Sequence, residues 1–267
     1  MEEKRNGKGM VIVIILLIIM ILCLAFYICY DKGIIFKEKD VTTSNNDINT
    51  ETKKEDEKVT FSDSDLEKYV NYISPVSIGP SSLIYSKDEV KLNNMTPKEK
   101  IEYVGSKINS KKVSSNDGQY DLFTIEESDV KKVVEEIYGP NTYEPATFNF
   151  GCGDYTLNNG KYTVKTGGCG GSTAIFVSNV VVGYNATKSK LEITTAYAFF
   201  DGTTKKIYKD YNITVALDDY TGGSTEETNA YLTNYVKNNK EKLNTIVYTF
   251  ESADGTNYYF TGFKNNK

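Results

Sequence analysis

The chain has 267 residues, 39% of them apolar, which is enough for a substantial core, and a formal net charge of −5. It contains no His, which excludes Ser-His and Cys-His catalytic dyads and zinc sites that use His. The first thirty residues carry three basic and two acidic side chains, so the remaining 237 carry a formal charge of −6. This acidic balance disfavours nucleic acid as a partner.

Residues 9–30, GMVIVIILLIIMILCLAFYICY, contain no charged side chain. A helix of these 22 residues, at about 1.5 Å per residue, crosses a hydrocarbon layer of roughly 30 Å. The run is longer than a signal-peptide core, and no small-x-small cleavage site follows it. We therefore expect a membrane-spanning helix that stays attached and contacts membrane lipid. Basic residues cluster more tightly before it than after it, so residues 1–8 are predicted as a cytoplasmic tail.

The next segments are predicted to be a stalk and then helices. Residues 31–62 mix charges of both signs with few apolar side chains, which is typical of a disordered stalk. We expect a helical segment over residues 63–124, where Thr96 begins the clearest helix because Pro follows it and Glu stands three positions on. A further helix is predicted from an N-cap at Ser128 to Gly139, which is followed by Pro.

Residues 125–267 are predicted to form an α+β extracytoplasmic domain in which helices pack on a curved antiparallel sheet. From residue 145 the apolar period becomes two, and segments rich in Tyr, Val, Ile and Thr alternate with Asn, Gly and Asp. A capping box beginning at Ser224 predicts one interrupting helix. The chain closes with two strands around Asp254-Gly255, a hairpin signal. The expected earlier strands are 145–150, 154–158, 161–166, 174–184, 190–200 and 206–217.

A helix that ends in Gly-Pro, a long meandering sheet and a final YTF…DG.NYYFTGF hairpin are the features that carry a resemblance. Over roughly residues 125–263 the chain resembles single-span surface proteins of Gram-positive bacteria with a cystatin-like or NTF2-like outer domain. The resemblance implies a domain that binds ligands or partners on the concave face of its sheet. It implies no particular functional residue.

The string Lys165-Thr166-Gly167 resembles one signature of penicillin-binding enzymes. That family also needs a Ser-x-x-Lys and a Ser-x-Asn. Ser128 and Lys131 have the first spacing, and residues 114–116 supply the second. The order is wrong, however, because the Ser-x-Asn precedes the candidate nucleophile, and only 34 residues separate Lys131 from Lys165. We therefore interpret the string as the outgoing strand of a hairpin that turns at Asn159-Gly160.

Two cysteines in the outer part are predicted to form a disulfide. Pairing about the Asn159-Gly160 turn places Cys152 opposite Gly167, two positions short of Cys169. A bulge in the surrounding glycine run absorbs that difference. Such a bond closes a loop of about 17 residues and stabilises the domain by roughly 3 kcal/mol in the chain-entropy model. It also fits an oxidising compartment. The alternative is two reduced, buried thiols.

The sequence contains no catalytic signature and no pattern that assigns a catalytic, cofactor-binding or metal-binding residue. The leading hypothesis is a non-enzymatic module, anchored in the cell membrane, that binds an extracellular ligand or an envelope protein. Two alternatives remain open: a cell-wall hydrolase that uses two carboxylates, and a structural subunit of an envelope assembly. A pocket with paired carboxylates favours the hydrolase, an apolar cleft the binder, and a flat apolar patch the subunit.

Overall fold

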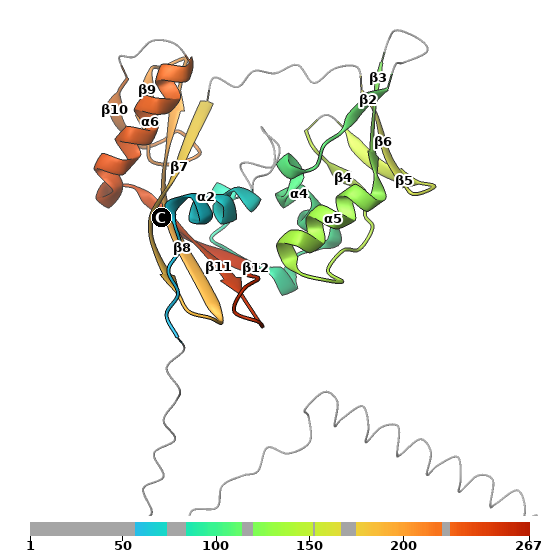
Figure 1. Cartoon of the computed structure of the whole chain (residues 1–267). Helices are drawn as coiled ribbons and strands as arrows, with labels where there is room; N and C mark the ends of the chain where they lie inside the picture. Colours follow the sequence, from blue (N-terminus) through green and yellow to red (C-terminus); the bar gives the residue numbers. More distant parts are fainter. Residues whose placement is uncertain (1–56, 74–83, 114–119, 152, 167–174, 221–224) are drawn as a thin grey trace, which may run out of the picture. The chain divides into compact units, whose positions relative to one another are not determined.

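The computed structural model describes residues 57–73, 84–113, 120–151, 153–166, 175–220 and 225–267 (Figure 1). This part of the chain is α+β, and the strand pairs of its two sheets are antiparallel. The predicted membrane helix 9–30, the tail 1–8 and most of the stalk lie outside the described residues. Among the residues described, none of the helices is both long and apolar enough to cross a membrane.

The larger sheet has seven strands in the order β1-β12-β11-β8-β9-β10, with β7 on the other edge of β8. Its strands are β1 (Glu89–Lys91), β7 (Ile175–Ala186), β8 (Lys190–Asp201), β9 (Lys206–Tyr208), β10 (Ala216–Asp219), β11 (Asn244–Glu251) and β12 (Tyr259–Asn266). The smaller sheet has the order β2-β3-β6-β5-β4. It consists of β2 (Lys111–Val113), β3 (Asp121–Glu126), β4 (Phe148–Asn149), β5 (Asp154–Asn158) and β6 (Lys161–Thr166).

The α-helices include α2 (Asp63–Tyr72), α4 (Pro97–Tyr103), α5 (Glu127–Tyr138) and α6 (Thr225–Asn239), and residues 84–86 are also helical. Short 3₁₀ turns lie at Leu92–Asn94, Gly105–Lys107 and Lys240–Lys242. The predicted capping box of α4 is confirmed, because the Thr96 hydroxyl accepts from the Glu99 amide at 3.2 Å and the Glu99 carboxylate accepts from the Thr96 amide at 2.9 Å. Gly139 ends α5 at φ 100°, a conformation that favours glycine.

Several local predictions differ from the structure. Ser128 lies inside α5, whose N-cap is Glu126. The segment 63–124, predicted to be helical, also contains strands β1 and β2 and most of β3. The predicted strand 206–217 is interrupted because the Asp210 carboxylate accepts from the amides of Thr214 and Val215, at 3.1 and 2.7 Å, and holds a loop. The predicted N-cap of α6, Ser224, lies outside the described residues.

The end of the predicted stalk joins the fold. Lys58 forms an antiparallel bridge with Thr187, and the Ser62 hydroxyl accepts from the Asp65 amide to cap α2. The Phe61 ring packs edge to face against the Tyr258 ring, with centroids 5.5 Å apart. Residues 57–62 are therefore part of the packed domain rather than of a disordered stalk, since these contacts offset their ordering entropy.

The two faces of β8 are covered by different elements, and this positions the site. Its odd-numbered side chains, such as Ile193, join the main core with Leu66 of α2 and Tyr248 of β11. Its even-numbered side chains from Ala196 onward form a second core with Leu232 of α6. Figure 1 shows α6 beside β7, β9 and β10. The even-numbered face nearer the start of β8, and the adjoining faces of β11, β12 and β1, carry neither core.

Candidate functional site

The open face of the larger sheet carries polar side chains at every second position. In β11 buried residues alternate with partly or fully exposed ones, and Val247, Thr249 and Glu251 point to the open side. Strand pairing sets their neighbours, because Thr249 lies opposite Glu192 of β8 and Val247 lies opposite Lys264 of β12. This pattern follows from the two-residue period of a strand whose other face is in the core.

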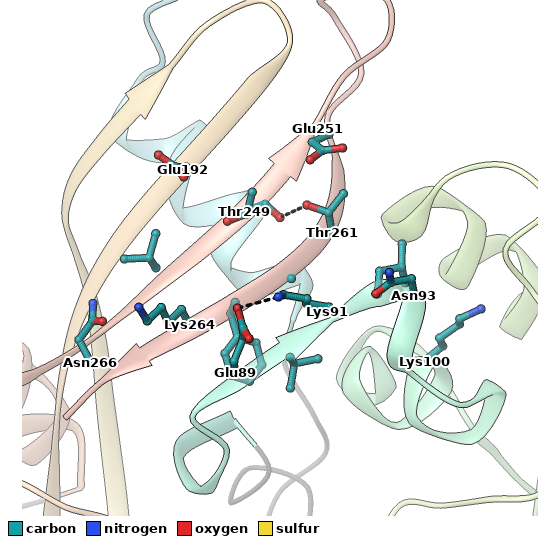
Figure 2. Close-up of a pocket in the computed structure, with 15 residues that line it drawn as sticks. Glu89, Lys91, Asn93, Lys100, Glu192, Thr249, Glu251, Thr261, Lys264 and Asn266 are labelled. Carbon is teal, nitrogen blue, oxygen red and sulfur yellow. Dashed lines mark hydrogen bonds and ion pairs between the residues drawn. The ribbon is translucent and has the colours of Figure 1, made fainter. Parts of the chain in front are cut away.

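The open face is hollowed. A cavity of about 880 Å³ lies over β1, β12 and β11, and its lining reaches Glu192 on β8 and Lys100 on α4. Figure 2 shows Thr249 and Thr261 on the sheet in this hollow, with Glu192 and Glu251 towards one end and Glu89, Lys91 and Lys264 towards the other.

Two backbone features shape the floor of the hollow. The register of β12 against β11 shifts at Thr261, so Thr249 lies opposite Gly262 and Phe250 lies opposite Phe260. The Thr261 hydroxyl, on the extra residue of this bulge, donates to the Thr249 carbonyl at 3.3 Å. Gly262 lies opposite Lys91 of β1, and a Cβ there would collide with the Val90 carbonyl oxygen. Only glycine allows β1 to approach this closely.

The charges around the hollow fall into paired and unpaired groups. The Lys91 ammonium lies 3.3 Å from a Glu89 carboxylate oxygen, and the Lys190 ammonium lies 2.7 Å from a Glu192 oxygen. Within the described part of the chain, Glu251 and Lys264 form no ion pair within 4.0 Å, and both are exposed. One carboxylate and one ammonium are therefore available to a bound molecule.

Lys100 contributes less to the open face than its place in the lining implies. Its ammonium donates to the Thr142 carbonyl at 3.3 Å and lies 4.0 Å from a Glu144 oxygen. These contacts join α4 to the segment that follows α5. Figure 2 shows its amino group directed away from the sheet, so its role is to hold the wall of the hollow.

Most of the residues that line the hollow are polar. The described side chains around the cavity offer carboxylates, ammonium groups, Thr hydroxyls and Asn amides, and they include no Cys, Ser, Tyr or His. Such groups can form hydrogen bonds and ion pairs with a bound molecule. Among the described residues, no group of three or more His, Cys, Asp or Glu side chains is arranged to hold a metal ion.

Comparison of the chain with known protein families, with curated proteins and with solved structures finds no match.

Of the residues singled out from sequence, those that the structure describes lie away from the hollow. Lys165 and Thr166 are on β6, as the hairpin interpretation predicts, and the Lys165 ammonium lies 4.7 Å from the centroid of the Tyr120 ring. The turn itself is confirmed, since Asn159 and Gly160 have φ of 49° and 73° between the paired residues Asn158 and Lys161. Cys152 and Cys169 lie outside the described residues, so their disulfide stays a prediction.

The hollow was not found from sequence. Its lining comes from four strands, a helix and a 3₁₀ turn, and each contributes only one to five residues. A partial signal exists in the closing hairpin, where Val247, Thr249 and Glu251 alternate with large apolar residues. This pattern indicates an open face but not which strands adjoin it.

Proposed function

We propose that this protein is a membrane-anchored binding module with its folded domain outside the cytoplasm, and that the hollow binds a polar ligand carrying both charges. The observation that carries this proposal is the pattern of ion pairs around the hollow. Glu89 and Glu192 are already paired with lysines, whereas Glu251 and Lys264 are left for a ligand. The apolar segment 9–30 and the resemblance to single-span surface proteins support the anchoring.

The charges around the hollow favour an extended ligand that carries both signs of charge, such as a peptide segment. A ligand with only one sign of charge meets repulsion from either the Glu or the Lys side chains of the hollow. Thr249 and Thr261 on the floor and Asn266 at one end provide hydrogen bonds along the same surface. Because Glu251 and Lys264 are exposed, their contribution to the binding free energy is modest and decreases as the salt concentration rises.

Fluorescence anisotropy with the full chain in detergent tests the proposal. Three labelled peptides of equal length are compared: one acidic, one basic, and one alternating Glu and Lys with Thr and Gly. We expect the alternating peptide to bind most tightly and to weaken as salt increases. Equal binding of all three peptides, or of none, contradicts the proposal.

Single substitutions locate the binding. Glu251→Gln and Lys264→Gln are each expected to weaken binding of the alternating peptide by up to about fivefold, since an exposed ion pair contributes roughly 0.2–1 kcal/mol. Glu136→Gln and Lys131→Gln on the exposed side of α5 make the same chemical changes away from the hollow. They should leave affinity unchanged, and an equal loss in these controls would indicate a general charge effect.

The hydrolase remains a second candidate for one reason, that Glu192 and Glu251 line the same hollow. Cleavage needs one protonated and one ionised carboxyl group flanking the bond. Incubation of the full chain with purified wall glycan, followed by assay of new reducing ends, distinguishes the two. Release of reducing ends by the unmodified chain that is lost in both Glu192→Gln and Glu251→Gln supports catalysis over binding.

A further inference from the structure

Strand β7 has a long open edge. On one side it pairs with β8 from Ile175 to Ala186. In the described part of the chain, the other side is contacted by backbone groups only near its end, where Lys58 bridges Thr187 and the Val59 amide donates to the Ala186 carbonyl. The Phe61 amide also donates to the Tyr184 hydroxyl at 3.4 Å, so this side chain lies beside the incoming segment. The chain then leaves the edge, because Ser62 begins α2. The stretch 175–185 thus presents a row of backbone groups that another strand can pair with.

This edge is accessible between the two helices that flank it. Asn179, Val180 and Val181 line a hollow of about 200 Å³ beside the strand. Its other walls come from α2 and α6 and include one charged side chain from each helix, Glu67 and Lys237. The two helices therefore do not close over the middle of the strand. The hollow leaves room beside the backbone where an added strand would lie.

The strand itself carries none of the residues that usually protect an edge from pairing. Natural edge strands carry Lys, Pro or inward-pointing charges that block addition. β7 reads IFVSNVVVGYNA and contains no charged residue and no Pro. It has one bulge, between Val181 and Gly183. Two of its large apolar side chains, Val177 and Tyr184, are 40% and 41% exposed.

The arrangement along β7 is self-complementary. Val177 lies opposite Phe199 of β8, Val180 opposite Ala196 and Tyr184 opposite Ile193. Because of the bulge, Val177 and Tyr184 share one face of the sheet, and each is three pairs away from Val180. A two-fold axis through Val180 would therefore place Val177 of each copy opposite Tyr184 of the other. No like charges would meet along the strand.

We infer that β7 is a dimerisation edge, on which a second copy of this chain pairs antiparallel about Val180 and joins the two larger sheets. Backbone hydrogen bonds along 175–185 hold the dimer. The Val177 and Tyr184 side chains are removed from water on both sides of the axis. This role is separate from the hollow on β11 and β12, so the two proposals succeed or fail independently.

Sedimentation of the full chain in detergent over a dilution series tests the inference. We expect a monomer–dimer equilibrium, and slower hydrogen exchange of the 175–185 amides as the dimer forms. Val177→Lys and Val177→Asp should each raise the dissociation constant by about tenfold or more, whatever the sign of the charge, because an unpaired charge would be buried at the interface. Val113→Lys on β2, at a site 42% exposed, is the matched control and should leave the equilibrium unchanged.

Three results would overturn the inference. The first is a chain that stays monomeric at every concentration. The second is a dimer that both Val177 variants leave intact, which would mean that another segment, such as residues 9–30, holds it. The third is an equal effect of Val113→Lys, which would indicate a non-specific response to added charge.

Discussion

At the scale of single residues, Glu102, with Asp201, is one of two buried charged residues that the structure describes. It is on α4, is 7% exposed, and its carboxylate accepts from the Asn149 amide at 2.8 Å. Burial raises the pKa of this carboxyl, while the bond from Asn149 and the Lys98 ammonium, 3.8 Å away, partly oppose the rise. Glu102 thus connects α4 to β4, but its ionised carboxylate carries a desolvation cost because it is buried.

The sign of the pH effect follows from this shift. Because the folded-state pKa of Glu102 lies above its ordinary value of 4.5, the folded chain binds this proton more tightly than the unfolded chain does. The contribution of Glu102 to stability is therefore present below pH 4.5 and is lost as pH rises through the raised pKa. At neutral pH the ionised carboxylate destabilises the fold relative to a neutral acceptor of the same shape.

Substitution of Glu102 separates its charge from its hydrogen bond. Glu102→Gln keeps an acceptor for the Asn149 amide, so the free energy of unfolding at pH 7 should stay the same or increase, with a weaker pH dependence above pH 4.5. Glu102→Leu leaves that amide without a partner and should cost about 1–3 kcal/mol. Urea unfolding of the full chain at several pH values measures both. Glu136→Gln, on the exposed side of α5, is the control. A loss of stability in Glu102→Gln as large as that in Glu102→Leu would contradict this explanation.

At the scale of elements, the attachment of β1 to β12 depends on one glycine. Gly262→Ala places a methyl group against the Val90 carbonyl, so we expect about 1–3 kcal/mol of destabilisation. Binding of the alternating peptide should also weaken, since β1 carries Glu89 and Lys91. Gly183→Ala on β7 is the matched control, because a Cβ there meets nothing within 4 Å. Equal losses of stability in the two variants would show that general strand flexibility, not the close approach, decides the effect.

Elements with local signals were predicted from sequence, whereas those set by distant contacts were not. The Asn159-Gly160 turn and the α4 capping box depend on residues within a few positions of one another, and both are confirmed. β3 was assigned mostly to a helical segment, because its strand state comes from pairing with β6, about forty residues later. Around Ile213, alternating apolar residues predicted a strand, but the Asp210 carboxylate captures the local amides.

At the scale of the whole molecule, the predicted anchor gives a direct test of location. Protease added to cells stripped of their wall should degrade residues 57–267 and spare a fragment that contains residues 9–30. A cytoplasmic protein should remain intact until the cells are lysed, and it serves as the control. Resistance of the folded domain before lysis but not after it would place the domain inside and contradict the predicted orientation.

Thiol labelling of the same preparation reports on the predicted bond between Cys152 and Cys169. We expect both to be labelled only after reduction, as an oxidising compartment requires. Labelling of both cysteines without reductant would contradict the disulfide.

The sequence by itself determined the apolar segment 9–30 as a candidate membrane helix, the α+β class of the domain, and the hairpins and caps whose signals are local. Only the tertiary structure decided which strands adjoin one another. It brought Glu192 beside Thr249, placed Lys264 opposite Val247, left half of one sheet face without a helix, and left one edge of β7 open. The physical reason is that a strand's period tells which side chains share a face, while strand order and helix placement depend on pairing between segments far apart in the chain.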